Sequence, residues 1–348
     1  MKARARLLPR KLVCFQEHVR QLGKQELTGV LGRSVGYIYG PVPSRRLGQS
    51  LGVDPIPFKV CNYNCVYCQL GRTRPLTNAR RDFFDPEHIL DEVKTALARR
   101  GDEGIDYITF VGQGEPLLCA SLGQLIRGVK AMSELPVAVI TNGSLLFLAD
   151  VREELIAADV VMPSLDAGEE MTFRRVNRPW PALRLGEIIA GMAAFRREFH
   201  GQLWVEVMLI KGLNDEESTL LQIRDALKDI QPDQVHINIP IRPPAERWVE
   251  PPDEQGLIRA LAILGEAATV VAPYQGTFQL AEDIPLLEAI VEVIRRHPMR
   301  ETEIFDALSG QDQGRVRAAL EDLAACGRAQ RIEYRGHAFW RYAGRLGS

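Results

Sequence analysis

The sequence predicts an α/β protein: a partial (β/α)6 TIM-like barrel followed by a small C-terminal winged helix-turn-helix domain. Two observations predict this fold. Between residues 50 and 240, short β-branched apolar runs alternate about six times with helical patterns, as buried parallel strands joined by helices do. After about residue 280, three helical patterns and a hairpin pattern follow. We therefore expect a basic N-terminal extension (1–36), a barrel (37–280) and a winged helix domain (281–348).

Six apolar runs, each ending in Gly, Asn, Asp or Pro, are predicted to be the barrel strands. They are residues 50–55, 105–112, 136–143, 159–167, 203–212 and 234–240. The patterns at 86–100 and 121–135 are typical of the intervening helices. In such a barrel the functional residues lie at the C-terminal ends of the strands. The proline-rich stretch 240–256 cannot be helix or central strand throughout, and we expect it to cross the barrel mouth.

The C-terminal segment predicts three helices and a hairpin, which is a winged helix-turn-helix pattern. The segments are residues 285–298, 301–310 and 312–327 for the helices and 328–342 for the hairpin. We expect Asp312 to cap the third helix and Gly327 to end it. Residues at helical spacing predict a separate small core: Leu287, Ile290, Val293, Ile294, Ile304, Leu308, Val316, Leu320 and Leu323.

Composition excludes several classes of protein. The 348-residue chain has a formal net charge of −2, so no global field indicates a nucleic-acid or membrane partner. No apolar run reaches the length of about 18 residues that a transmembrane helix needs, and the basic N-terminus lacks the apolar stretch of a secretory signal. Cys14, Cys119 and Cys326 are scattered and show no disulfide framework. We expect a cytoplasmic protein without a membrane partner.

The stretch VCNYNCVYCQLG, residues 60–71, places Cys61, Cys65 and Cys68 at C-x3-C-x2-C spacing. Three thiolates this close can bind a soft metal centre. A structural zinc site needs four protein ligands, and a disulfide would leave one cysteine over. A [4Fe–4S] cluster on three cysteines leaves one iron open to an external ligand. The structural alternative is a zinc or cluster site that only holds the loop together.

The motif, with aromatic Tyr67 directly before its last cysteine, resembles the signature of the radical S-adenosylmethionine (SAM) superfamily. Residues 39–71, with their PSRRLG stretch, are similar to the Fe–S oxidoreductase subfamily related to the wyosine tRNA-modifying synthetases. The resemblance covers roughly residues 37–280 and implies the partial barrel fold. It also implies two cofactors, a [4Fe–4S] cluster on the three cysteines and SAM, and an electron donor of the low-potential flavodoxin or ferredoxin type. In that superfamily the open iron chelates SAM, and reductive cleavage gives methionine and a 5′-deoxyadenosyl radical.

The GQGEP turn, residues 112–116, follows the second predicted strand. A glycine-rich turn with one carboxylate suits capture of an ammonium group. The resemblance assigns Gly114 and Glu115 to the methionyl amino group of SAM, with Gln113 where other members often have glycine. It likewise places Tyr67 among the cofactor-binding residues. The structural alternative is a simple turn in which Glu115 caps a helix.

Short polar residues end the third and fourth predicted strands. We expect Asn142, Ser164 and Asp166 to face SAM, because such side chains can bond ribose hydroxyls or a carboxylate; loop capping is the alternative. The resemblance places the backbone at Ile239, after the sixth strand, against the adenine. His236 on that strand is expected to be a hydrogen-bonded core histidine.

Three basic residues are candidates for contact with substrate. Lys211 ends the fifth predicted strand and can neutralise a carboxylate, hold a substrate anion or form a Schiff base; a solvated strand-end lysine is the alternative. Arg45 and Arg46 of PSRRLG can bind an anionic substrate. A structural ion pair beneath the cluster loop explains these two arginines equally well.

Two hypotheses for function follow. The first is a radical SAM enzyme that abstracts hydrogen from an RNA, a peptide or a small molecule. The second is a metal- or cluster-carrying regulatory binding protein with a winged helix for recognition. Wyosine synthetases carry further N-terminal cysteines for a second cluster, whereas only Cys14 precedes the motif here. The charges of the C-terminal segment are mixed, which favours a peptide or protein partner over nucleic acid.

Overall fold

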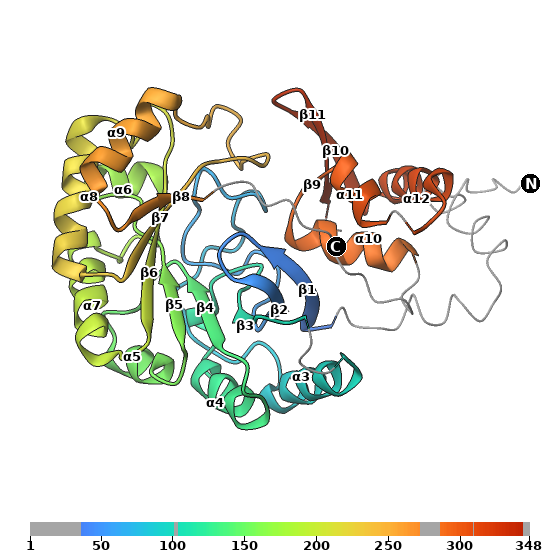
Figure 1. The fold of residues 1–348 in the computed structure, drawn as a ribbon, viewed down its shortest axis with the longest axis horizontal. Helices are drawn as coiled ribbons and strands as arrows, with labels where there is room; N and C mark the ends of the chain where they lie inside the picture. The colour runs from blue at the N-terminus through green and yellow to red at the C-terminus, as the bar shows by residue number, and fades with distance from the viewer. Residues whose placement is uncertain (1–35, 101–103, 272–285, 309, 344–348) are drawn as a thin grey trace, which may run out of the picture. The chain divides into compact units, whose positions relative to one another are not determined.

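The computed structural model describes residues 36–100, 104–271, 286–308 and 310–343 (Figure 1). Residues Tyr37–Gln279 form one compact unit, and the described residues after 285 belong to a second. Of the expected N-terminal extension only Gly36 is described, so that expectation lies outside the described residues. No helix of the described segments combines the length and apolar character needed to cross a membrane.

The first unit is built on one eight-stranded sheet. Its strands are β1 (Ile38–Ser44), β2 (Gly48–Val53), β3 (Tyr107–Phe110), β4 (Val137–Thr141), β5 (Val160–Pro163), β6 (Gln202–Met208), β7 (Gln234–Asn238) and β8 (Ala268–Val270). They follow one another in sequence order, with β1 and β8 at the edges. β1 is antiparallel to β2, and every later pair is parallel. The sheet is therefore an open, mostly parallel barrel, which confirms the predicted fold class.

Helices cover the outer face of this sheet (Figure 1). They are α3 (Pro86–Arg100), α4 (Leu122–Met132), α5 (Ala149–Leu155), α6 (Glu170–Val176), α7 (Leu185–Glu198), α8 (Glu217–Ile230) and α9 (Glu254–Leu264), with a short 3₁₀ helix η1 (Pro116–Leu118). The main core lies between helices and sheet and includes Ile108, Val139, Phe195 and Val205, all fully buried. The sheet is covered by helices on one face and packs inside the barrel on the other. Burial of both faces explains why the strand sequences are continuous apolar runs.

The six predicted strands are β2 to β7, and the structure adds β1 and β8. β1 contains Pro41 and Pro43, which read as a break in the sequence; as an edge strand it tolerates them. β8 has three residues, too few for a periodic signal. The stretch 240–253 has no regular secondary structure, and α9 takes up the last residues of the proline-rich segment.

A smaller apolar cluster fills the inner side of the sheet. Leu47, in the turn between β1 and β2, packs there with Val160, Met162 and Trp204. Glu206 lies two residues after Trp204 on β6 and points to the same inner side, since alternate residues of a strand share a face. The β1–β2 turn thus supplies an apolar floor that lies next to a charged residue.

The second unit combines three helices with a three-stranded antiparallel sheet. Its elements are α10 (Leu286–Arg296), β9 (Met299–Arg300), α11 (Glu301–Ala307), α12 (Gln313–Ala325), β10 (Ala329–Tyr334) and β11 (His337–Tyr342), with β11 between β10 and β9. Asp312 caps α12 by accepting the Arg315 N–H at 2.8 Å, and Gly327 follows with φ of 71°. The three predicted helices and the hairpin are confirmed, and β9 is new. The winged-helix assignment stays a prediction.

The predicted small core of this unit is largely present. Its buried members are Ile290, Ile294, Ile304, Leu308, Val316, Leu320 and Leu323. Leu287 is only half-buried, and the Val293 side chain lies outside the described part. Phe339 and Trp340 of β11 are also buried, at 1% and 5% exposed.

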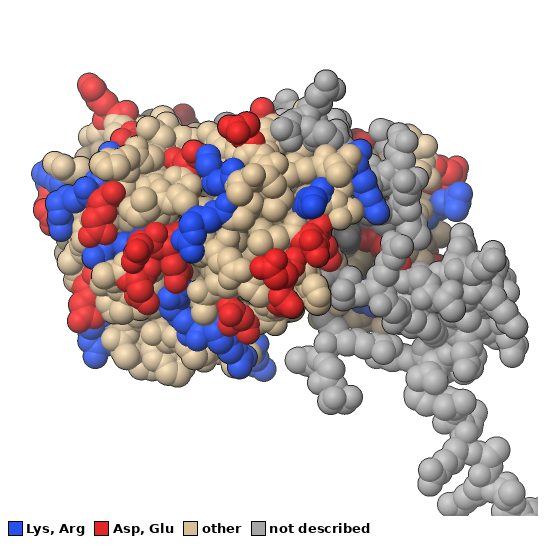
Figure 2. Space-filling view, turned by 90° about the horizontal axis from the view of Figure 1, so that it is seen from below, with Lys and Arg blue, Asp and Glu red and all other residues tan. Residues whose placement is uncertain are grey.

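Charges of both signs are mixed on the surface. Figure 2 shows basic and acidic side chains interleaved over the described part of one barrel face. In the second unit, Arg331 lies 3.3 Å from Glu301 and 2.6 Å from Glu333. Arg317 lies over the Phe305 ring at 5.4 Å. These two arginines are engaged within the unit, so neither adds freely to a cationic surface.

Removal of residues 282–348 should leave the barrel unit folded, because each unit has its own buried core. We expect the truncated protein to keep a single cooperative melting transition and, after reconstitution, the iron content of the full chain. Thermal unfolding followed by circular dichroism, with iron counting, checks this. Aggregation or loss of iron after truncation would contradict the independence of the barrel.

Candidate cluster and cofactor site

The cysteine loop follows β2 directly and is anchored to two other elements. The backbone N–H groups of Asn64 and Val66 donate to the carbonyls of Asn177 and Val176 at the end of α6, each at 3.0 Å. On the other side, the Cys61 carbonyl accepts the Thr77 N–H at 3.0 Å. The loop therefore has a fixed path although it contains no regular helix or strand.

Each of the three sulfurs lies within hydrogen-bond distance of a nitrogen donor. The donors are Tyr63 N–H to Cys61 Sγ (3.3 Å), Asn177 Nδ2 to Cys65 Sγ (3.6 Å) and Lys59 Nζ to Cys68 Sγ (3.2 Å). Nearby N–H donors and positive charge favour a thiolate over a thiol. They also tune the reduction potential of a thiolate-bound cluster. Each of the three sulfurs thus has a nitrogen donor that would stabilise a metal-bound thiolate.

Burial opposes the ionisation of two of these thiols. Burial, followed by the charge of Glu115, raises the pKa of Cys61 to about 12. Burial, followed by the charge of Asp166, raises the pKa of Cys65 well above its ordinary value. A coordinating metal deprotonates a thiol outright. These environments therefore fit metal-bound thiolates better than reactive free thiols.

The donor set fits an iron–sulfur cluster better than a single metal ion. Among the described residues, no group of three or more His, Cys, Asp or Glu side chains forms a site for one ion. Mononuclear zinc needs such convergence, whereas each cysteine of a [4Fe–4S] cluster binds a different iron. Cys119 is buried and its Sγ lies 3.4 Å from the Ser121 hydroxyl, so it is engaged elsewhere. Three cysteines would hold such a cluster and leave its fourth iron without a thiolate.

Glu115 joins the ends of β3 and β4 beside the cysteine loop. Its Oε1 accepts the Thr141 hydroxyl at 2.5 Å and the Leu117 N–H at 2.9 Å, and its Oε2 accepts the Asn142 N–H at 2.8 Å. Burial raises the pKa of Glu115 to about 7, against the lowering effect of these bonds. The capping role is thus present, since Glu115 caps η1. Contact between its carboxylate and the SAM amino group stays a prediction.

Gly114 and Gln113 place this turn against the cysteine loop. A Cβ on Gly114 would lie 1.8 Å from the Val60 carbonyl oxygen, so no side chain fits there. The Gln113 side chain turns away and donates from Nε2 to the buried Asp54 carboxylate at 2.7 Å. Gln113 therefore links the segment after β3 to the segment after β2 through its bond to Asp54. Gly114 allows the GQGEP turn and the cysteine loop to approach closely.

Asn142 points back to the cysteine loop. Its Nδ2 donates to Asn62 Oδ1 at 2.7 Å and lies 3.8 Å from Cys61 Sγ. Asn62 is fully buried and donates in turn to Ser144 and Asn78, at 2.7 and 2.8 Å. Asn142 therefore lies next to the predicted cluster site. It belongs to a hydrogen-bond network that holds the cysteine loop in place.

Tyr67 and Asp166 meet on the opposite side of the loop. The Tyr67 hydroxyl donates to Asp166 Oδ2 at 2.6 Å, and Asn177 Nδ2 donates to the same oxygen at 2.6 Å. Asp166 Oδ1 accepts the Met208 N–H at 2.8 Å. Burial raises the pKa of Asp166. Both oxygens are thus used by the protein, so Asp166 orients Tyr67 and Asn177 around Cys65.

The remaining cofactor candidates lie at neighbouring strand ends. Ser164 follows β5, and its hydroxyl lies 3.5 Å from the Thr141 carbonyl. Ile239 follows β7 directly and is half-buried. Their contacts with SAM stay predictions. His236 is buried, and its Nε2 lies 3.0 Å from Gln234 Oε1. Both observations agree with a hydrogen-bonded core histidine.

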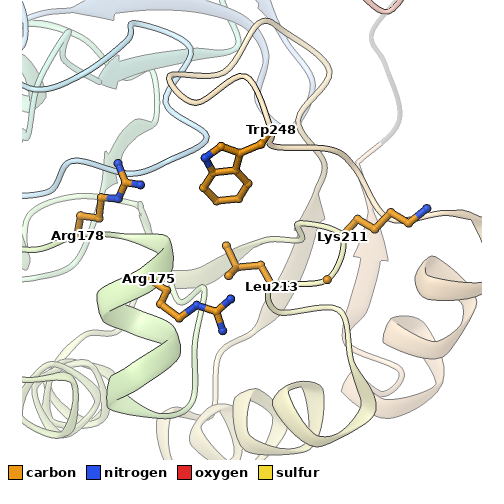
Figure 3. A pocket seen from close by; sticks show the side chains of 6 residues that line it. Arg175, Arg178, Lys211, Leu213 and Trp248 are labelled. Carbon is orange, nitrogen blue, oxygen red and sulfur yellow. The ribbon is translucent and has the colours of Figure 1, made fainter.

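Lys211 lines a pocket of about 460 Å³ at the barrel mouth, together with Arg175, Arg178, Gly212, Leu213 and Trp248. In Figure 3 the Lys211 side chain runs away from Trp248 and Leu213. Its Nζ lies 3.9 Å from the exposed Asp253 carboxylate. Arg178 is held by Glu246 at 2.5 Å. This geometry does not favour a Schiff-base lysine, since the ammonium is half exposed and turned outward.

Arg45 and Arg46 lie on the inner side of the sheet. Arg46 Nη1 pairs with Glu206 at 2.6 Å, which is the structural ion pair considered as an alternative. Arg45 Nη2 lies 3.5 Å from the Asn238 amide oxygen. Burial, followed by repulsion from Arg46 and Arg242, lowers the pKa of Arg45 to about 10. The two adjacent arginines therefore differ: one has a carboxylate partner and the other an amide.

Several residues at the site gave no usable signal in the sequence. Asn177 follows α6 and reaches Cys65 across 112 positions of the chain. Glu206 lies within β6 and Asn238 is the last residue of β7. In the sequence both are only polar residues within apolar runs, which gives no sign of a functional site. Only Lys59, two residues before Cys61, offered a local sign: a basic residue within reach of the motif.

Comparisons with known proteins agree with this geometry. The model of the radical SAM superfamily matches residues 56–223. A UPF0026 protein of Methanocaldococcus jannaschii is 35% identical over 308 residues, covering 87% of this chain and 94% of the relative. The chain belongs to the UPF0026 family of radical SAM proteins. A UPF0026 protein of Synechocystis is 39% identical over 215 residues, 61% of this chain and 79% of the relative.

Solved structures are more distant from this UPF0026 protein. TYW1 with a lysine–pyruvate adduct bound has 16% identity and a TM-score of 0.47, covering 74% of this chain and 89% of that chain. The superfamily expectation is confirmed by the family match. The radical SAM region includes the cysteine loop, the GQGEP turn and the polar ends of β4 and β5.

Replacing Cys61, Cys65 or Cys68 by alanine should abolish cluster binding, because each removes the thiolate for one iron. Alanine at Cys119 or Cys326 is the matched control and should leave iron content unchanged. Anaerobic reconstitution with iron and sulfide counting checks this. Full iron content in any of the three loop variants would contradict the assignment.

Gly114→Ala should damage the cluster site without unfolding the barrel. The added Cβ would meet the Val60 carbonyl at 1.8 Å, which forces the cysteine loop to shift. We expect a loss of about 1–3 kcal/mol in unfolding free energy and reduced iron content. Gly186→Ala is the control, since a Cβ in that helix meets nothing within 4 Å. Normal iron binding by Gly114→Ala would show that the loops need not approach so closely.

Proposed function

We propose that this protein is a [4Fe–4S]-dependent radical SAM enzyme that cleaves SAM reductively and abstracts hydrogen from a substrate. One observation carries the proposal: three cysteines of one loop, each beside a nitrogen donor, lie next to the turn that holds Glu115. Cys61, Cys65 and Cys68 would hold the cluster. When bound, the cluster supplies the electron that breaks a C–S bond of SAM, giving methionine and the 5′-deoxyadenosyl radical.

The residues of the chain would bind and orient SAM around this loop. The turn at Gly114 and Glu115 lies where an ammonium group can meet backbone carbonyls and a buried carboxylate. Asn142 and Ser164 present short polar side chains from β4 and β5. The backbone at Ile239 offers a surface for adenine. These roles follow the superfamily resemblance and the placement of all five residues at strand ends.

The buried surroundings would also protect a radical. Tyr67, Asp166 and Asn177 form a hydrogen-bonded wall beside Cys65. Their polar atoms are satisfied within the protein, so they do not need water. A site that excludes water prevents side reactions of reactive intermediates.

A low-potential flavodoxin- or ferredoxin-type protein is the electron donor that this chemistry requires. For the second unit we favour recognition of a peptide or protein over nucleic acid, because its arginines are mixed with acidic residues. The chemical class of the substrate is taken up below.

The competing function is a regulator that carries a metal or cluster without catalysis. The three-cysteine donor set favours the enzyme, because a purely structural site would complete its coordination with protein ligands. No single-ion site is formed by the described residues.

The deciding experiment is anaerobic reconstitution followed by reduction with dithionite in the presence of SAM. We expect about four irons and four sulfides per chain, and 5′-deoxyadenosine with methionine as products. Cys65→Ala should give neither product. A wild-type protein that binds the cluster yet never yields 5′-deoxyadenosine would favour the regulator, and zinc in place of iron would exclude the radical chemistry.

A further inference from the structure

A group of charged and polar side chains lies on the inner side of the sheet, apart from the cysteines. Arg45 and Arg46 enter it from the β1–β2 turn, Glu206 from β6 and Asn238 from β7. Arg46 pairs with Glu206 at 2.6 Å, and Asn238 Nδ2 donates to the same carboxylate oxygen at 3.1 Å. The Asn238 amide oxygen lies 3.5 Å from both guanidinium groups. One oxygen of Glu206 is therefore shared by one arginine and one amide.

Arg45 is left without a counter-charge in this group. Among the described residues, no carboxylate forms an ion pair with it, and its one hydrogen bond goes to an amide. Arg46 lies beside it and Arg242 is near enough to repel it, while Glu206 is the only acid that acts on it appreciably. A buried charge without a partner is strongly unfavourable. The fold thus maintains an excess of positive charge at this place.

Unpaired buried polar atoms are found in the same group and beside it. Arg45 Nη1, Arg46 Nε, Trp204 Nε1 and His236 Nδ1 are buried and have no hydrogen-bond partner in the protein. Trp204 and His236 are in edge-to-face contact, with ring centres 5.4 Å apart, and the charges of Glu206 and Arg46 both act on His236. Buried polar groups in native proteins are nearly always paired. The two unpaired guanidinium nitrogens of Arg45 and Arg46 are donors, and with the excess positive charge they indicate a ligand with acceptor oxygens.

An oxyanion meets all of these requirements. A carboxylate or a phosphate accepts several bonds from guanidinium groups and neutralises one of them. Water alone would satisfy the donors but would leave the charge of Arg45 uncompensated. The Arg46 and Glu206 side chains are largely buried, at 14% and 12% exposed, which strengthens their interaction with a charged ligand.

The site is connected to the proposed reaction centre. Arg242 Nη1 lies 3.4 Å from Gln69 Oε1, and Gln69 follows Cys68 directly. Asn238 precedes Ile239, the expected adenine contact. The arginine group therefore lies at the end of β7, directly before the expected adenine contact.

We propose that Arg45, with Arg46 beside it, binds the carboxylate or phosphate group of a small-molecule substrate on the inner side of the barrel. As a substrate site this rests on the proposed radical function, whereas the binding of an oxyanion is measured independently. The Arg46–Glu206 pair acts as a fixed platform, and Arg45 supplies the charge that the substrate neutralises.

Calorimetry of the reconstituted protein with inorganic phosphate and with propionate, at constant ionic strength set by chloride, tests this. We expect saturable binding of one anion per chain. Preference for phosphate or propionate identifies the source of the oxyanion. Arg45→Met should weaken binding about 10- to 150-fold, as expected for a lost charge-assisted bond, and Arg45→Lys should weaken it less. Arg224→Met, at a surface ion pair on α8, is the matched control and should bind normally.

The melting temperature in chloride provides a second readout. Removing an uncompensated buried charge should raise it in Arg45→Met, whereas loss of a structural contact would lower it. Failure of both anions to bind wild type, or unchanged binding by Arg45→Met, would overturn the proposal. So would an equal loss of SAM affinity in Arg45→Met, because the guanidinium would then serve the carboxylate of SAM. Absence of 5′-deoxyadenosine from wild type would instead refute the radical function and leave the anion site standing.

Discussion

The close approach of the GQGEP turn to the cysteine loop fixes the geometry of the barrel mouth. The Val60 carbonyl accepts the Glu115 N–H at 2.9 Å, and the absence of a side chain at Gly114 makes this contact sterically feasible. Glu115 then bonds to the end of β4 at Thr141 and Asn142. Through this chain of contacts, three strand ends hold one irregular loop. Without it, the cysteine spacing alone would not determine where the sulfurs point.

Burial sets the chemistry of the same region. Two carboxylates, Glu115 and Asp166, lie beside cysteines and are surrounded by protein donors, while burial raises the pKa of each. An opposite charge placed beside a buried carboxylate lowers its pKa. A bound cation, such as the ammonium or sulfonium of SAM, would favour their ionised forms. A positive charge bound here would therefore oppose the effect of burial on both carboxylates.

Local sequence patterns predicted most of the helices and strands but few of the contacts between side chains. The buried strands β2 to β7 and the helices α3 and α4 are marked by apolar periodicity, and the cysteine motif by spacing. β1 and β8 lacked such signals because one contains prolines and the other has three residues. The Arg46–Glu206 pair joins positions 160 residues apart, which no local rule can specify. Sequence reasoning could identify both arginines as candidates, but the difference between them appears only in three dimensions.

That difference has a physical consequence for the whole inner side of the sheet. Leu47, which follows the two arginines, is fixed in the apolar floor beside Trp204. Moving the backbone of this turn outward would remove Leu47 from that floor and expose a fully buried side chain. Burial of Leu47, worth about 1.5–3 kcal/mol, thus holds the arginine in an environment that opposes its charge. The packing of Leu47 thus maintains the unfavourable environment of the Arg45 charge, and binding of the proposed anion would compensate that charge.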